Sequence, residues 1–385
     1  MKYVNGQSTK YRRIIMLDKM NPQERPAFHG SDIEQIEQYY HIPKERIVKF
    51  GANVNPLGLS DSVKKKLAGN LDVITRYPDR DYKSLRKVIS GYCNADMGHV
   101  VTGNGSTELI SLLISQRNAL HALVIGPTYS EYERELSLTG GKISNYYLKE
   151  SLGFRLEIDD LEKSLEEDVD FLIFCNPNNP TSSVLKHEEL KAVLDACRKR
   201  GIFVMIDETY VEFAPSIDEI TAMPFVPDYD NLMVIRGVSK FFAAPGLRLG
   251  YGVTSNQEFL RTLKKHQNPW SLNSIGAYAG ELMLQDKEYI RQTRQLILSE
   301  RDRCLQTLRG FRYAKTYPSY GNFILLKITK EGLDSFTVFE HAVKQGLMLR
   351  DCSSFEGLPG EYIRFCIMKP EDNTRLLACL EELLA

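Results

Sequence analysis

The sequence lacks an excess of charge of either sign. Forty-nine Lys and Arg residues oppose 50 Asp and Glu residues, which gives a formal net charge of -1. Nucleic acids and anionic membrane surfaces attract proteins with a basic excess, so this balance argues against both kinds of partner. The sequence also lacks any apolar run that approaches the roughly 18 residues of a membrane span. We therefore expect neither a nucleic-acid partner nor a membrane partner.

Paired cysteine motifs are absent as well. The seven cysteines are an odd number, are scattered along the chain and form no C-x-x-C pair. Several stand in apolar runs, as Cys175 does after Phe171-Leu-Ile-Phe. This usage is typical of buried free thiols in a reducing compartment, so we expect a cytoplasmic protein without a metal site. Residues 1–28 are basic but lack the apolar core of a secretory signal, and we interpret them as an extension, with a transit peptide as the alternative.

Length and pattern favour a two-domain α/β protein. A chain of 385 residues can form two domains with substantial cores. The apolar runs 170–175 and 202–206 are typical of strands buried on both faces, and the helix expected at 188–200 lies between them. We therefore expect a largely parallel sheet. A long helical stretch at 273–311 then leads to a second, α+β region, with strands at 323–326, 347–349 and 363–367 and a closing helix at 371–384.

Polar and aromatic residues follow the ends of several expected strands. They are Gly103–Thr107, Tyr129, Asn179 and Asp207. Ligands of α/β proteins bind at the carboxyl ends of the strands, so these positions are expected to share one site. The turn at 103–107 joins a strand to a helix, and such a turn can bind an anion through its N–H groups. Taken alone that signal is weak, because many tight turns look similar.

The stretch Arg236–Tyr251, RGVSKFFAAPGLRLGY, carries the strongest signal. Lys240 is followed by two phenylalanines and two alanines, which favour burial. Burial lowers the pKa of a lysine and makes a neutral amine available, which can form a Schiff base with an aldehyde. Arg248 follows the turn at Pro245-Gly246, and an arginine fixed in this way suits a phosphate. The stretch therefore predicts a site for a phosphorylated aldehyde.

The pattern S-K-x4-P-G-L-R-x-G resembles the lysine signature of pyridoxal-phosphate (PLP) enzymes with the aspartate aminotransferase fold. The resemblance implies fold type I, with a mostly parallel seven-stranded sheet between helices and a smaller α+β domain. It divides the chain into an extension (1–28), a segment joining the small domain (29–72), a large PLP-binding domain (73–275) and a small C-terminal domain (276–385). Lys240 would form the Schiff base and act as general acid–base. Asp207 would keep the pyridine nitrogen protonated, although the residues alone leave Glu208 as a second candidate.

The same resemblance implies further contacts to PLP. Asn179 and Tyr210 would donate to the ring oxygen, and Tyr129 would stack on the ring. The phosphate would be held by Gly105, Ser106, Thr107, Ser239 and Arg248, and by Tyr77 from the neighbouring subunit of a homodimer. Two positions depart from the family pattern: Ser182 stands where many members have glycine, and Gly237 where many have serine or threonine. The second departure puts one phosphate hydrogen bond in doubt.

Within this superfamily the chain resembles the histidinol-phosphate aminotransferase branch, and within that branch the threonine-phosphate decarboxylases of cobalamin synthesis. The resemblance lies in His29-Gly30, Phe50–Gly58, Arg76–Asp79, Gly103–Gly105, Pro269–Asn273, Arg350–Cys352 and Ile363-Arg364. It implies decarboxylation of a phosphorylated amino acid, L-threonine O-3-phosphate, to (R)-1-aminopropan-2-yl phosphate. The substrate would contact His29, Gly30, Asn53, Arg350 and Arg364. Met368 stands where the decarboxylase pattern has a second arginine, which weakens the assignment to threonine phosphate itself.

Three other functions stay open. The first is transamination of histidinol phosphate or a similar amine, because the two reactions differ only in which substrate bond stands perpendicular to the cofactor ring. The second is decarboxylation of L-serine O-phosphate. The third is a PLP-binding protein without catalysis, which the joint presence of Lys240, Asp207, Tyr210, Asn179 and Arg248 argues against. For Arg350 a surface ion pair is the alternative role.

Overall fold

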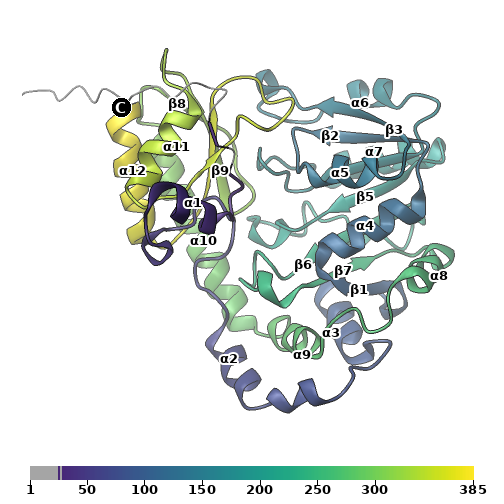
Figure 1. Ribbon diagram of the computed structural model, residues 1–385. Helices are drawn as coiled ribbons and strands as arrows, with labels where there is room; N and C mark the ends of the chain where they lie inside the picture. The colour runs from purple at the N-terminus through teal and green to yellow at the C-terminus, as the bar shows by residue number, and fades with distance from the viewer. Residues whose placement is uncertain (1–24, 27) are drawn as a thin grey trace, which may run out of the picture.

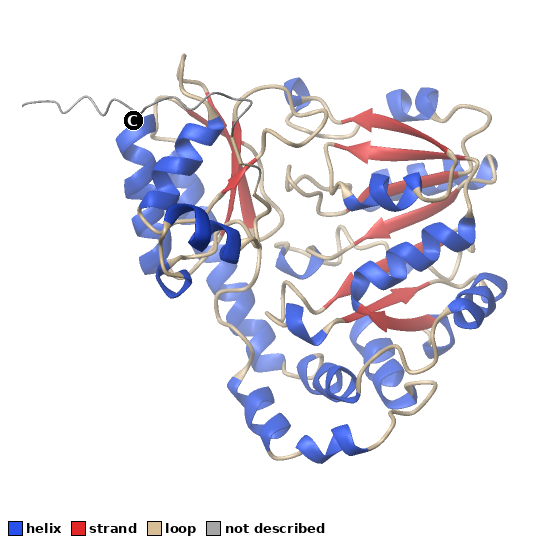
Figure 2. Cartoon of the chain, in the orientation of Figure 1, coloured by secondary structure: helices blue, strands red, loops and turns tan. Residues whose placement is uncertain are grey.

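The computed structural model describes residues 25, 26 and 28–385 (Figure 1). Most of the extension predicted at 1–28 therefore lies outside the described residues. Two separate sheets organise the chain, a seven-stranded one and a four-stranded one (Figure 2). The fold-type I architecture predicted from the sequence is confirmed. None of the described helices is both long enough and apolar enough to cross a membrane.

The large sheet has the strand order β1-β7-β6-β5-β4-β2-β3. Its strands are β1 (Val100–Asn104), β2 (His121–Gly126), β3 (Lys142–Tyr147), β4 (Phe171–Cys175), β5 (Phe203–Asp207), β6 (Leu232–Gly237) and β7 (Leu249–Val253). Strands β3, β2, β4, β5 and β6 pair in parallel, whereas β7 runs antiparallel to both β6 and β1. The loops that follow β2, β4, β5 and β6 consequently gather at one edge of the sheet.

Alternate residues of the central strands pack into two hydrophobic cores, one on each face of the sheet. In β4, Leu172 and Phe174 pack on one face, and Phe171 and Ile173 pack on the other. Successive side chains of a strand point to opposite faces, so a continuous apolar run fills both cores. Helix α7 (His187–Lys199) covers the first face, and α4 (Gly105–Arg117) covers the second. This layering fixes the loops at the carboxyl edge of the sheet.

The other helices surround the two sheets. They are α1 (Ile33–Tyr40), α2 (Asp61–Ala68), α3 (Lys83–Cys93), α5 (Glu131–Ser137), α6 (Ile158–Ser164), α8 (Gln257–His266), α9 (Ser274–Met283), α10 (Lys287–Leu308), α11 (Ser335–Lys344) and α12 (Pro370–Leu384). In Figure 1, α10, α11 and α12 stand beside the small sheet, and α2, α3 and α9 lie at the lower end of the molecule.

The small sheet is antiparallel, with the order β10-β11-β9-β8. Its strands are β8 (Ala314–Thr316), β9 (Phe323–Ile328), β10 (Arg350–Asp351) and β11 (Tyr362–Cys366). The early segment around Val48 joins this region, because Val48 forms a bridge with Leu347 and the carbonyl of Phe50 accepts from the N–H of Cys366. We propose the division predicted from the sequence, with 29–72 joining a small domain at 276–385 and a large domain at 73–275.

Several elements differ from those expected. The helical stretch at 273–311 is two helices, because the chain turns at Leu284–Asp286 and the Asp286 carboxylate caps α10 by accepting from the N–H of Tyr289 (3.1 Å). The strand expected at 347–349 is instead a bridge at Leu347 followed by the short β10. The sequence analysis did not identify α5, α8, α11, β7 or β8.

Candidate active site

A cavity of about 660 Å³ opens at the carboxyl edge of the large sheet, next to the small sheet. Most of the residues predicted from the sequence to form the site line it: His29, Gly30, Asn53, Ser106, Thr107, Tyr129, Asn179, Asp207, Tyr210, Ser239, Lys240, Arg248, Arg350 and Arg364. Gly105 lies beside the lining, and Tyr77 lies elsewhere on the surface. The fold therefore brings together residues that are more than 300 positions apart in the chain, such as Gly51 and Arg364.

Lys240 lies in the turn between β6 and β7, half-buried at the wall of the cavity. Its Nζ donates a hydrogen bond to the carbonyl oxygen of Ala52 (2.8 Å), and its own carbonyl accepts from the N–H of Asn55 (3.0 Å). Burial, together with the nearby guanidinium groups of Arg364 and Arg248, lowers the pKa of Lys240 from 10.5 to about 8. A fraction of the amine is therefore neutral near pH 7, as the sequence predicted.

Asp207 is the last residue of β5 and is buried at the base of the cavity. Its Oδ2 accepts from the Tyr132 hydroxyl (2.7 Å), and its Oδ1 accepts from the N–H (2.9 Å) and the hydroxyl (2.5 Å) of Thr209. Burial raises the pKa of Asp207, and these hydrogen bonds partly oppose that effect. The carboxylate is thus fixed in orientation by neutral groups. The sequence analysis missed Tyr132, because nothing in a tyrosine three residues after Tyr129 marks it as a partner of Asp207.

Glu208, the second candidate for the carboxylate role, faces away from the cavity. It is fully buried and accepts two hydrogen bonds from Arg236, from Nε (2.9 Å) and Nη2 (2.7 Å). Thr221 and the N–H of Ala222 also donate to it. Glu208 is therefore fully engaged in a buried ion pair, whereas Asp207 is presented to the cavity.

Arg248 and the turn at Gly105 form a cationic end of the cavity. Gly105 begins α4 with φ +85°, and a Cβ at this position would lie 2.6 Å from Nη2 of Arg248. Only glycine allows the guanidinium to approach this closely. Ser106 and Thr107 present the N-terminus of α4 to the same space, where N–H groups and the helix dipole favour an anion. A Cβ at Gly237 would meet Ser106 at 3.6 Å, so a serine there would also fit.

The turn at Asn53 connects the two sheets at the cavity. Asn53 is buried with φ +56°, and its side-chain amide donates to the hydroxyl of Tyr210 (3.3 Å). Its carbonyl accepts from the side chain of Asn322 (3.0 Å), which directly precedes β9. The side-chain oxygen of Asn53 has no hydrogen-bond partner among the described residues. A buried unpaired oxygen at a cavity wall is suited to a ligand donor.

Arg350 and Arg364 lie opposite each other in the pairing of β10 and β11. Arg350 donates to the carbonyl of Phe28 and to the hydroxyl of Ser354 (2.8 Å). Arg364 donates to the side-chain oxygen of Asn179 and to the carbonyl of Gly51 (2.8 Å). Within the described part of the chain, neither arginine pairs with a carboxylate. Arg350 is thus not in the surface ion pair considered as its alternative role, and both guanidinium groups line the cavity without a direct ion pair among the described residues.

His29 and Gly30 reach the cavity because two backbone segments cross there. A Cβ on Gly30 would lie 2.0 Å from the carbonyl oxygen of Gly51, so only glycine allows the crossing. The His29 side chain is 73% exposed, and its Nδ1 lies 3.5 Å from the carboxylate of Asp32. Met368, by contrast, contacts the sulfur of Cys366 (3.6 Å) and does not line the cavity.

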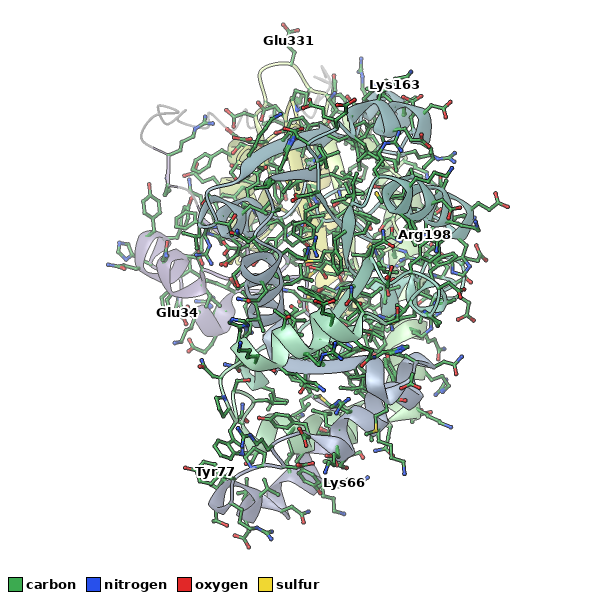
Figure 3. The ribbon with its side chains drawn as sticks, turned by 90° about the vertical axis from the view of Figure 1, so that its right-hand side faces the viewer. Glu34, Lys66, Tyr77, Lys163, Arg198 and Glu331 are labelled. Carbon is green, nitrogen blue, oxygen red and sulfur yellow. The ribbon has the colours of Figure 1, made fainter. Side chains whose placement is uncertain are left out.

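Tyr77 lies at the edge of the molecule, away from this cavity (Figure 3). It is 82% exposed, and its ring packs against Trp270 with a centroid distance of 5.0 Å. Leu71 and Ile74 of the preceding 3₁₀ helix are also exposed. Exposed apolar residues in one region are typical of an interface between subunits.

Comparisons with known proteins agree with this arrangement. Residues 45–380 match the family described as aminotransferase class I and II. The chain is 34% identical over 356 residues to threonine-phosphate decarboxylase of Salmonella typhimurium, covering 92% of this chain and 96% of that protein. It is 28% identical to histidinol-phosphate aminotransferase of Methanococcus aeolicus over 92% of this chain and 95% of that protein. The crystal structure of the histidinol-phosphate aminotransferase from Clostridium acetobutylicum superposes with a TM-score of 0.81 at 31% identity, covering 86% and 97% of the two chains.

Proposed function

Because the chain belongs to the aminotransferase class I and II family, with pyridoxal 5′-phosphate as its cofactor, we propose that it decarboxylates a phosphorylated amino acid. The substrate that we propose first is L-threonine O-3-phosphate, with (R)-1-aminopropan-2-yl phosphate as the product. This reaction would supply the side chain of cobalamin. The similarity to threonine-phosphate decarboxylase supports the reaction type. We also propose a cytoplasmic homodimer in which Tyr77 reaches the neighbouring site.

The residues of the cavity fit this cofactor. The aldehyde carbon would be bound by Lys240, the pyridine nitrogen would face Asp207, and the phosphate would lie against Arg248 and the turn at Gly105–Thr107. Asp207 has no cationic partner among the described residues, so its carboxylate is left for a protonated ring nitrogen. When bound, the cofactor supplies a ring that accepts the electron pair released at the substrate Cα. We further assign Asn179 and Tyr210 to its ring oxygen and Tyr129 to its ring face.

The observation that carries the substrate proposal is the pair of arginines at the small sheet. Like charges directly opposite each other in a sheet are destabilising, and the two guanidinium groups donate their hydrogen bonds only to neutral oxygens here. A ligand with two anionic groups would relieve this repulsion and could bind each guanidinium in a bidentate manner. L-Threonine O-3-phosphate has both a carboxylate and a phosphate. We propose that Arg364, nearer to Asn179, orients the carboxylate, and that Arg350, with His29 and Gly30, receives the phosphate. Asn53 would be a further contact to the substrate, with its unpaired side-chain oxygen as an acceptor.

Lys240 is the group that moves protons in this proposal. Its pKa of about 8 allows the amine to accept a proton and to return it to Cα at neutral pH. The carbonyl of Ala52 keeps the amine on one side of the cavity. Loss of CO₂ requires the bond between Cα and the carboxylate to be perpendicular to the cofactor ring. That orientation depends on which arginine binds the carboxylate and which binds the phosphate.

Transamination is the second candidate function. Histidinol phosphate has one anionic group, which leaves one arginine unpaired. The acceptor 2-oxoglutarate, however, has two carboxylates and would also satisfy both arginines. The similarity to histidinol-phosphate aminotransferases over more than nine-tenths of the chain supports this candidate. Decarboxylation of L-serine O-phosphate differs from the first proposal by one substrate methyl group.

Product analysis separates these functions. PLP-loaded enzyme would be incubated with L-threonine O-3-phosphate, with and without 2-oxoglutarate. Release of CO₂ and an amino-alcohol phosphate without any keto acid would support the decarboxylase. Turnover only in the presence of 2-oxoglutarate, with glutamate as a product, would refute it in favour of an aminotransferase, and histidinol phosphate would be tested next. If neither reaction occurs, L-serine O-phosphate is the next substrate, and its inactivity would refute decarboxylation of either phosphoamino acid.

A further inference from the structure

Ser182 departs from the glycine expected in its motif, and the structure gives its side chain a defined set of partners. It is fully buried in the turn that follows β4, with φ +59°. A serine is strained at this backbone angle, whereas glycine adopts it freely. Its hydroxyl oxygen accepts from the N–H groups of Gly321 (2.7 Å) and Tyr320 (3.0 Å). The side chain of Ser182 therefore connects the turn after β4 of the large sheet with the segment that precedes β9 of the small sheet.

The hydrogen bonds around this hydroxyl form a directed chain. Ser319 Oγ lies 3.1 Å from Ser182 Oγ, and it donates its own proton to the carbonyl of Phe323 (2.6 Å). A hydroxyl has one proton, so the bond between the two serines must be donated by Ser182. Ser182 thus accepts two hydrogen bonds and donates one, and its hydrogen-bonding capacity is used in full.

The segment that Ser182 holds leads directly to the candidate site. Asn322 follows it and donates to the carbonyl of Asn53, and the carbonyl of Asn322 accepts from the N–H of Ile367 (2.7 Å), just after β11. Strand β9 then pairs with β11, where Leu325 lies opposite Arg364. Arg364 returns to the large sheet by donating to Asn179, three residues before Ser182. The Asn179–Arg364 contact and the contacts of Ser182 with residues 319–321 therefore join the same turn to the small sheet.

We propose that Ser182 is a positioning residue that fastens the small sheet to the large one and so fixes Arg364 at the cavity. This proposal rests on the substrate-binding role proposed above for Arg364. A glycine at position 182 would keep the turn and lose the hydroxyl. The Asn179–Arg364 contact and the backbone bond from the Tyr320 N–H to the carbonyl of residue 182 would then join the turn to the small sheet. Arg364 would then sample more positions. Substrate affinity would fall, and the rate of the chemical step would change less.

Hydrogen exchange of single amides in the PLP-loaded enzyme tests the contact directly. The Gly321 N–H has Ser182 Oγ as its acceptor, whereas the Tyr320 N–H also has the Ser182 carbonyl (3.0 Å), which every variant retains. In Ser182→Gly we expect Gly321 to exchange roughly tenfold faster or more, with a smaller change at Tyr320. The matched control is Ser183→Ala, whose hydroxyl contacts Thr181 (2.7 Å) and does not reach the small sheet.

Ser182→Ala separates the hydroxyl from the flexibility of glycine, because alanine retains the Cβ and its backbone restriction. Faster Gly321 exchange in both Ser182 variants, with KM for L-threonine O-3-phosphate raised roughly three- to tenfold and kcat changed less, is the expected result. Unchanged Gly321 exchange, an effect confined to the glycine variant, or faster exchange with an unchanged KM would overturn the proposal. If the wild-type enzyme does not turn over this substrate, the proposed function fails, while the exchange rates still report on Ser182.

Discussion

The pH dependence of cofactor capture by Lys240 follows from its surroundings. The enzyme without cofactor must present a neutral amine to the aldehyde, and a lysine pKa of about 8 places that deprotonation in an accessible range. At pH 7 about one-tenth of such an amine is neutral, against roughly 3 in 10,000 for an amine at the ordinary value. The fold therefore raises the neutral fraction of the amine at pH 7 by roughly 300-fold.

The sign of the dependence is fixed because the pKa is lowered. The neutral fraction, and with it the rate of capture, rises from pH 6.5 and levels off above pH 9. Stopped-flow absorbance of PLP mixed with cofactor-free enzyme would measure this rate. Because the guanidinium of Arg364 lowers the pKa of Lys240, Arg364→Met should move the midpoint to higher pH. A wild-type midpoint near 10.5, or the same pH profile for a PLP analogue without the aldehyde, would refute the reasoning.

Three further predictions follow from particular contacts. Arg364→Ala and Arg350→Ala should each raise KM for L-threonine O-3-phosphate roughly 100-fold, because each removes a charged donor to one of its anionic groups. Arg291→Ala, on the exposed face of α10, is the control and should leave KM unchanged in the same assay. Gly105→Ala should weaken PLP binding at least tenfold in an equilibrium titration, because the new Cβ would clash with the guanidinium of Arg248. The matched control is Gly140→Ala, which also has a positive φ (+78°) but open space around it, and it should leave PLP binding unchanged. Tyr132→Phe removes a donor that lowers the pKa of Asp207. As the pH is lowered, PLP affinity should therefore begin to fall at a higher pH than in the wild type, and identical profiles would contradict this role.

The sequence predicted which residues would meet at the cavity, because each of the motifs that it used directly follows an expected strand. The glycine turn before α4, Asn179 after β4 and Lys240 after β6 are all placed by short apolar runs. A parallel sheet aligns the carboxyl ends of its strands, so identifying the strands was sufficient to bring these residues together. The same reasoning could not place Tyr77, whose predicted role belongs to another subunit.

What the sequence did not reveal depends on contacts between distant segments. The carbonyl of Ala52 meets Lys240 across 188 positions, and the hydroxyl of Tyr132 meets Asp207 across 75. A backbone carbonyl carries no residue-specific signal, and a buried tyrosine is an ordinary core residue in any α/β protein. Ser182 was visible as a departure from a pattern, but its partners in the 319–321 segment emerge only when the two sheets are placed together.

The adjacent acids Asp207 and Glu208 show how charge distinguishes residues that a sequence alone leaves equivalent. At the end of β5 the two side chains diverge, and Glu208 meets Arg236 on the neighbouring strand β6. That pair neutralises itself inside the protein, and removing either partner would leave a costly unpaired charge. Asp207 receives only neutral donors, and burial raises its pKa. A buried carboxylate without a cationic partner is stabilised when the ligand supplies the cation. Asp207 is therefore the residue suited to a protonated ring nitrogen, whereas Glu208 is already paired with Arg236.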